Sequence, residues 1–259
     1  MSSSVSFAGS GNLAWHLAPA LDNAGYSVRE VYSRNPAHAA ALVERLYEAE
    51  VKATLDFSTS DSRIFIIAVS DDAIEAVARE IILPDDAILI HTSGSQSLSK
   101  LGYAATPDTG VFYPLQTFSK ARKIDFKDVP IFIESESEAV EKILLKMGHA
   151  ISRQVFSIDS DRRKALHVAA VFASNFTNHM LRISKQVADQ NDLDFDWLKP
   201  LIAEALNKSL AIGPEYAQTG PAKRGDLETL DRHMAFLQYD EKLAELYRVI
   251  SQHIVDNDE

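Results

Sequence analysis

Apolar residues follow two alternating patterns through the first part of the chain. Short, nearly continuous apolar runs are typical of strands buried in a parallel sheet, and they alternate with segments in which apolar residues recur at helical spacing. The runs predict strands near residues 5–8, 27–35, 63–70, 87–90, 110–112 and 129–135, with a short strand or loop at 51–57. The helical segments between them cover 12–25, 37–49, 73–82 and 137–148. This alternation predicts an α/β domain with a mostly parallel, doubly wound sheet.

The pattern changes after Arg153, where long helical segments take over. They predict helices at residues 160–190, 196–212, 227–239 and 240–255. We therefore expect two domains, a Rossmann-like domain over residues 1–153 and an all-helical domain over residues 154–259.

The first strand runs directly into a glycine turn and a helix. The turn has the form G-x-G-x-x-A, in which the first glycine makes the tight turn and the second lets a pyrophosphate approach the backbone. The small Ala14 lets the helix pack closely on the strand. An ordinary glycine-rich turn is the alternative. The pattern predicts a dinucleotide site formed by Gly9, Ser10, Gly11, Asn12 and Leu13.

The end of the second strand indicates which dinucleotide binds. A unit that prefers NAD usually places Asp or Glu there, to hold the ribose 2′-hydroxyl. This chain has Ser33 and Arg34 instead. A hydroxyl and a guanidinium suit a 2′-phosphate, so the sequence favours NADP. The alternative is that Arg34 is a solvated surface residue.

Two later strands end in polar loops. Val69 and Ser70 precede Asp71 and Asp72, either of which could instead cap the following helix. His91, Ser93 and Gly94 follow the next strand. Because ligands of open α/β sheets lie at the carboxyl ends of strands, we expect these loops to contact the cofactor near its nicotinamide.

Candidate catalytic residues lie in the helical part of the chain. His167 and Asn175 share a predicted helix face with Lys164, and a histidine there could act as a general acid. Arg224 could bind a substrate carboxylate through two hydrogen bonds. The alternatives are a solvated helix face for the first group and a helix cap at Asp226, paired with Arg224, for the second.

Composition narrows the class of protein. A net charge of −11 argues against a nucleic-acid surface. The sequence has no cysteine, which fits a cytoplasmic protein, and it has neither a signal-peptide pattern nor an apolar run long enough to span a membrane. His167, His179 and His233 lack the spacing of metal ligands, so we expect no metal site.

Four ordered motifs carry a family resemblance: HTSGS, FYPLQTFS, LHVAAVFASNF and TGPAKRGD. They resemble the two-domain Rossmann-like proteins described as coenzyme deazaflavin-dependent NADP oxidoreductases, which are related to pyrroline-carboxylate reductase, ketopantoate reductase and the β-hydroxyacid dehydrogenases. The resemblance implies an NADP-binding domain and a helical domain like that of 6-phosphogluconate dehydrogenase, which commonly forms dimers. Many relatives have histidine where this chain has Tyr113, so the resemblance gives that position no role.

Two functions from different classes follow. The first is an NADP(H)-dependent oxidoreductase that transfers hydride to or from a small carbonyl or imine substrate bound between the two domains. His167 would be its acid, and Asn175 and Arg224 would position the substrate. The second is an NADP-binding sensor or partner-binding protein without turnover. A Rossmann fold without a cofactor is a third reading.

Overall fold

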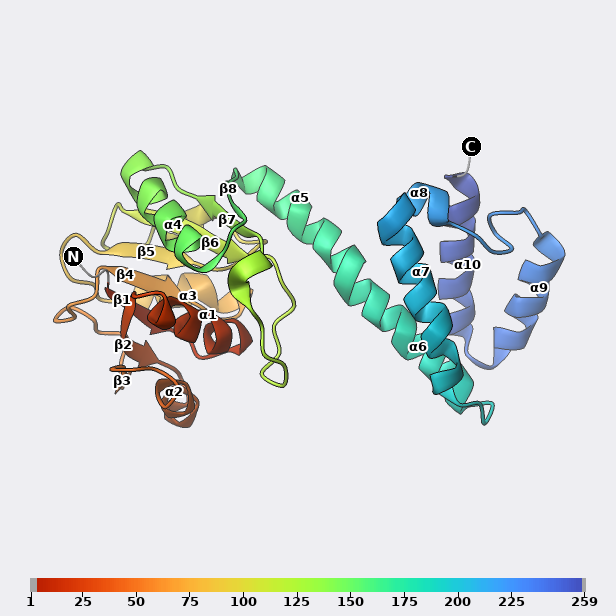
Figure 1. The fold of residues 1–259 in the computed structure, drawn as a ribbon, viewed down its shortest axis with the longest axis horizontal. Coiled ribbons are helices and arrows are strands. Elements are labelled where there is room, and N and C mark those ends of the chain that lie inside the picture. The colour runs from red at the N-terminus through yellow and green to blue at the C-terminus, as the bar shows by residue number, and fades with distance from the viewer. Residues whose placement is uncertain (1–3, 258–259) are drawn as a thin grey trace. The chain divides into compact units, whose positions relative to one another are not determined.

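The computed structural model describes residues 4–257 and divides into two compact units (Figure 1). The first unit ends at His179 and the second begins at Met180. The predicted domain boundary at 153 stays a prediction. The first compact unit also includes the beginning of the helical part of the chain, residues 160–179.

The first unit is built on one sheet of eight strands in the order β3-β2-β1-β4-β5-β6-β7-β8. Neighbouring strands are parallel except β6 and β7, which are antiparallel. The strands are β1 Ser4–Ala8, β2 Ser27–Tyr32, β3 Glu50–Lys52, β4 Ile64–Ile67, β5 Ile88–His91, β6 Thr109–Pro114, β7 Ile131–Glu134 and β8 Val155–Ser157. The order reverses between β1 and β4, which is where open α/β sheets bind ligands.

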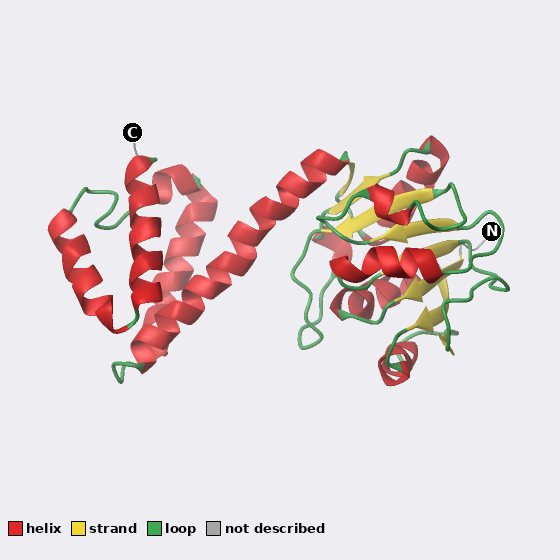
Figure 2. Cartoon of the chain, turned by 180° about the vertical axis from the view of Figure 1, so that it is seen from behind, coloured by secondary structure: helices red, strands yellow, loops and turns green. Residues whose placement is uncertain are grey.

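Helices cover both faces of this sheet (Figure 1, Figure 2). They are α1 Asn12–Asn23, α2 Pro36–Val43, α3 Ile74–Glu80 and α4 Glu138–Ile151. Leu17 of α1 and Leu144 of α4 belong to one buried cluster with the β1 residue Phe7. Ile74 of α3 belongs to a second cluster with Phe65 of β4. A sheet with a separate core on each face is the doubly wound arrangement that the sequence predicts.

The remaining helices begin with α5 Ser160–Ala170, which leads through a π-helical turn, Val171–Phe176, into α6 Thr177–Asp189. They continue with α7 Lys199–Ile212, α8 Pro214–Ala217, α9 Leu227–Phe236 and α10 Glu241–Asp256. The prediction of one regular helix over 160–190 missed the π turn. The predicted helix over 37–49 was too long, because α2 ends at Val43 in a series of turns.

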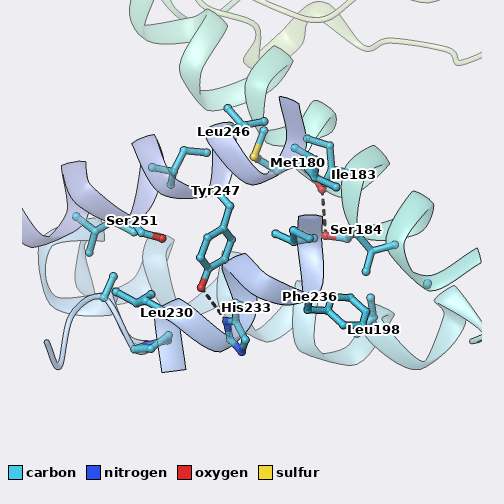
Figure 3. A pocket seen from close by; sticks show the side chains of 18 of the residues that line it. Met180, Ile183, Ser184, Leu198, Leu230, His233, Phe236, Leu246, Tyr247 and Ser251 are labelled. Carbon is cyan, nitrogen blue, oxygen red and sulfur yellow. Dashed lines mark hydrogen bonds between the residues drawn. The ribbon is translucent and has the colours of Figure 1, made fainter. Parts of the chain in front are cut away.

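The helical unit contains an apolar cavity of about 670 Å³ (Figure 3). Side chains such as Met180, Ile183 and Leu246 line it. A polar pair also reaches it, because the Tyr247 hydroxyl lies 2.8 Å from His233 Nδ1. Within the described residues, the helices are too short or too polar to cross a membrane.

Candidate functional site

The two glycines after β1, Gly9 and Gly11, differ in whether their backbone conformation and contacts require glycine. Gly9 has φ of +127°, and a Cβ built on it would lie 2.2 Å from the Ala68 carbonyl oxygen. The fold itself therefore requires glycine at this position. Gly11 has φ of −70°, and the nearest atom to a Cβ there would be the Ala68 oxygen at 3.8 Å. Among the described residues, no close contact around Gly11 requires glycine, so a ligand could approach its backbone.

The N-terminus of α1 has the features of an anion site. Gly11 is its N-cap and provides no side chain to bind the first amide groups, and the first turn holds no acidic residue. Gly11 and Asn12 are exposed, Leu13 is half-buried and Ser10 is buried. The free N–H groups and the helix dipole can therefore bind phosphate oxygens.

The β2 end places Ser33 and Arg34 beyond the sheet, with Arg34 exposed. A hydrogen bond from Ser70 is the main reason that the pKa of Asp72 lies below its usual value, and the charge of Arg34 contributes. Arg34 therefore lies near the loop after β4. Glu30, earlier in β2, is buried and bonds to Lys52 and Ser6, so it is engaged inside the sheet.

The β4 loop corrects one prediction. We considered Asp71 or Asp72 as a helix cap, but both lie inside a 3₁₀ turn, Asp71–Ala73, and the N-cap of α3 is Ala73. Asp71 instead accepts a hydrogen bond from the Ser95 hydroxyl. This bond joins the loop after β4 to the loop after β5.

His91 is more deeply buried than a loop residue would be. It is the last residue of β5, and its side chain is fully buried. Burial, with the charge of Arg163 as a second cause, lowers its pKa to about 4. The Ser93 amide donates to its Nδ1. Among the described residues its Nε2 has no hydrogen-bond partner, although the Ser97 backbone lies near enough to oppose the shift slightly. The imidazole is therefore neutral at pH 7, and its contact with a cofactor stays a prediction.

Gly94 lies beneath two side chains from distant parts of the sequence. A Cβ built on Gly94 would lie 2.6 Å from His167 Nδ1 and 2.8 Å from the Tyr113 hydroxyl oxygen. These two atoms are 3.1 Å apart and share a hydrogen bond. Tyr113 belongs to β6 and His167 to α5. The structure thus brings together two predicted residues, Gly94 and His167, with Tyr113, to which the sequence assigned no proton transfer.

Arg163 holds this region together, and sequence reasoning missed it. Its side chain is fully buried and pairs with Glu134 at 2.8 Å. Its guanidinium also donates to the carbonyl oxygens of Ser93 and Gly94, at 2.9 and 3.0 Å. Because Arg163 lies in the charged run DRRK, its sequence context suggests a surface residue. A signal was available in its position, since it precedes His167 by one helical turn.

The other predicted site residues of the helical part of the chain are exposed. Lys164 is exposed and pairs with Asp161 at 3.8 Å. Asn175 is exposed in the π turn, and Arg224 is exposed in the second unit. The Asp226 side chain caps α9 by accepting from the Thr229 amide at 3.1 Å, which confirms the helix cap considered for it.

Comparisons with known proteins cover the whole chain. Residues 4–94 match the family model described as NADP oxidoreductase coenzyme F420-dependent, and residues 129–254 match a domain of unknown function, DUF2520. A crystal structure titled "putative NADP oxidoreductase BF3122 from Bacteroides fragilis" is 36% identical over 98% of each chain, with a TM-score of 0.89. The chain belongs to this family of two-domain NADP oxidoreductases.

More distantly related solved structures share the fold, and some of them contain a bound cofactor. The protein TM1727 from Thermotoga maritima is 24% identical over 98% of each chain, with a TM-score of 0.72. A reductive aminase from Aspergillus terreus, in complex with NADPH and ethyl levulinate, is 15% identical over 100% of this chain and 95% of its own, also with a TM-score of 0.72. At these identities the likeness shows the fold. No curated protein matches the chain.

The NADP oxidoreductase family implies NADP as cofactor, and the first unit fits it. The side-chain-free backbone at Gly11 and the open N-terminus of α1 suit a pyrophosphate. Arg34 suits a 2′-phosphate, while no carboxylate of β2 is free for a ribose hydroxyl because Glu30 is bound to Lys52.

Proposed function

We propose that this oxidoreductase transfers hydride between NADP(H) and a small carbonyl or imine substrate. When bound, NADPH supplies the hydride, and the chain's residues orient the reactants and provide a proton. The observation that carries the proposal is the cluster of Gly94, Tyr113 and His167 at the carboxyl ends of β5 and β6. A proton donor at this edge of the sheet lies where Rossmann-type domains bind the reactive part of their ligands.

We assign the cofactor contacts as follows. The turn from Gly9 to Leu13 binds the pyrophosphate, and Ser33 with Arg34 binds the 2′-phosphate. Val69 and Ser70, with the segment from His91 to Gly94, line the nicotinamide end. His167 supplies the proton, and Asn175 and Arg224 position a substrate, which Arg224 suggests is a carboxylate. Substrate binding between the two domains and a cytoplasmic location stay predictions.

Substitution of Arg34 tests the cofactor assignment. We expect Arg34→Ala to weaken NADPH binding at least about tenfold and NADH binding much less, because only NADPH carries the 2′-phosphate. Arg29→Ala is the matched control, since Arg29 lies on β2, the strand that precedes Arg34, and pairs with Glu48 on the surface. Cofactor fluorescence titrations measure both constants. Equal losses for both cofactors would refute the assignment to the 2′-phosphate.

Turnover tests the substrate class. NADPH oxidation is followed with a panel of small keto acids, ketones and cyclic imines, with His167→Ala as the inactive comparison. Turnover that is lost in His167→Ala supports the proposal. Tight NADPH binding without turnover of any panel member contradicts it and favours an NADP-binding sensor.

We also propose that the protein is a homodimer formed through its helical unit. The exposed apolar side chains of α7 support this, since Leu201 is 65% exposed and Leu210 is 86% exposed. Exposed apolar side chains gathered on one helix are typical of a surface that another protein covers.

A further inference from the structure

We propose that Tyr113 gives the proton directly to the substrate's carbonyl oxygen or imine nitrogen, and that His167 returns a proton to Tyr113. This inference rests on the proposed function and refines the role given there to His167. It makes Tyr113 a catalytic residue and His167 its relay.

The position of Tyr113 supports this order of transfer. It lies near the end of β6, beside the β5 loop, because β5 and β6 are parallel and hydrogen-bonded neighbours. Its ring and that of His167 meet edge to face, with centroids 6.0 Å apart. His167 Nδ1 is engaged with the Tyr113 oxygen at 3.1 Å. In the tautomer with hydrogen on Nδ1, His167 donates this bond, and the phenol hydrogen stays available to a substrate.

Gly94 lets the loop after β5 pack against this pair. Any side chain at position 94 would collide with both the Tyr113 hydroxyl and His167 Nδ1. The loop backbone thus lies directly against the Tyr113–His167 pair. In this proposal the nicotinamide ring lies against Ser93 and Gly94, next to the Tyr113 hydroxyl.

Charged groups near Tyr113 influence how readily its phenol releases and regains a proton. Burial raises the pKa of its phenol, so the hydroxyl is protonated at pH 7. The Arg163 guanidinium on α5 opposes this shift and favours the phenolate, whereas Asp71 adds to it. His91 on β5 is neutral at that pH. Arg163 can therefore stabilise the negative charge that forms on Tyr113 when its proton leaves.

The reduction step balances as follows. Hydride brings two electrons to the substrate carbon, and the π pair of the C=O or C=N bond moves to the oxygen or nitrogen. That atom takes the proton of the Tyr113 hydroxyl. The phenolate takes the Nδ1 proton of His167, and His167 Nε2 takes a proton from water. The net reaction consumes one hydride and one solvent proton, and the oxidation direction reverses each transfer.

The test follows the ionisation of Tyr113 by NMR of protein labelled at tyrosine ¹³Cζ, with Tyr113→Phe identifying the resonance. The oxidised nicotinamide ring is positively charged and the reduced ring is neutral. If Tyr113 faces the ring, its phenol ionises at least about one pH unit lower with NADP⁺ than with NADPH. Tyr47, 75% exposed, is the internal control and should titrate alike in both complexes. Identical titration of Tyr113 in both complexes overturns the proposal.

Two further measurements complete the test. His167→Leu should raise the ionisation pH of Tyr113, because it removes a donor to the phenolate, and an unchanged value overturns the relay. If the protein unfolds before Tyr113 ionises, the resonance at pH 7 decides, since it moves on NADPH binding only when Tyr113 lies at the ring.

Turnover separates this inference from the proposed function. With any substrate found in the panel, Tyr113→Phe should lower kcat by about 10²- to 10⁴-fold and leave NADPH affinity within about threefold. Tyr47→Phe should leave both unchanged. If no panel member is reduced, the substrate class is wrong, yet the NMR titration still shows whether Tyr113 faces the cofactor.

Discussion

At the scale of single residues, Gly9 and Gly11 separate folding from cofactor binding. Gly9→Ala should lower the free energy of unfolding by at least about 2 kcal/mol, because the new side chain is strained and meets the Ala68 carbonyl. Gly11→Ala should leave stability within about 0.5 kcal/mol and weaken NADPH binding. Urea denaturation and fluorescence titration measure the two effects. Strong destabilisation by Gly11→Ala would show that the fold also requires that glycine.

His91 should make stability depend on pH. Its folded pKa of about 4 lies below the unfolded value of 6.5, so the unfolded chain binds the extra proton in this interval. The free energy of unfolding should therefore fall by about 3 kcal/mol as the pH drops from 6.5 to 4. Urea denaturation across this range measures the slope.

The variant His91→Asn should lose this part of the pH dependence, whatever its stability at pH 7. His149→Asn, at an exposed position on α4, should retain it. Equal slopes for wild type and His91→Asn would show that other groups cause the loss.

The glycine turn was easier to predict than residues buried by the fold. The spacing of Gly9, Gly11 and Ala14 carries its own physical reason in a strand–turn–helix unit. The hydrogen bond between Tyr113 and His167 and the burial of Arg163 became visible only in the structure, because both depend on contacts between residues far apart in the sequence. Within DRRK, only the spacing of one helical turn between Arg163 and His167 indicates which arginine turns inward.

At the scale of elements, Arg163 connects the first turns of α5 to the loop after β5. Arg163→Met should lower the free energy of unfolding by about 3 kcal/mol or more, because it leaves the Glu134 carboxylate without its buried partner. The two loop carbonyls that Arg163 binds would also lose their donor. Arg153→Met is the matched control, since it breaks an exposed pair with Asp128 and should cost less than about 1 kcal/mol. Similar losses from both variants would contradict a role for burial.

Most helices and strands could be predicted from the sequence, but the direction in which neighbouring strands pair could not always be predicted. Apolar runs such as IFII mark strands buried on both faces, which β4 confirms. The antiparallel direction of β7 could not be read, because its apolar pattern is the same for either direction. The π turn also escaped prediction, since its residues are compatible with an α-helix.

At the scale of the whole molecule, the dimer gives a direct prediction. Leu210→Glu should shift the protein toward monomers, because it places a charge on an apolar surface that a second subunit would bury. Gln186→Glu adds the same charge at an exposed polar position of α6 and should leave the assembly unchanged. Sedimentation velocity measures both. A wild-type protein that sediments as a monomer at all concentrations would disprove the dimer.

The contrast between the two glycines also bears on how this family evolves. Descendants of such a protein are expected to keep Gly9 for as long as they keep the fold. Its positive φ and its close contact with Ala68 are properties of the folded chain and involve no ligand. By our proposal, selection on Gly11 lasts only while the protein binds a nucleotide. A descendant that retains Gly9 but has lost Gly11 is therefore expected to keep the fold and to have lost nucleotide binding. Its sequence alone would indicate this change of function.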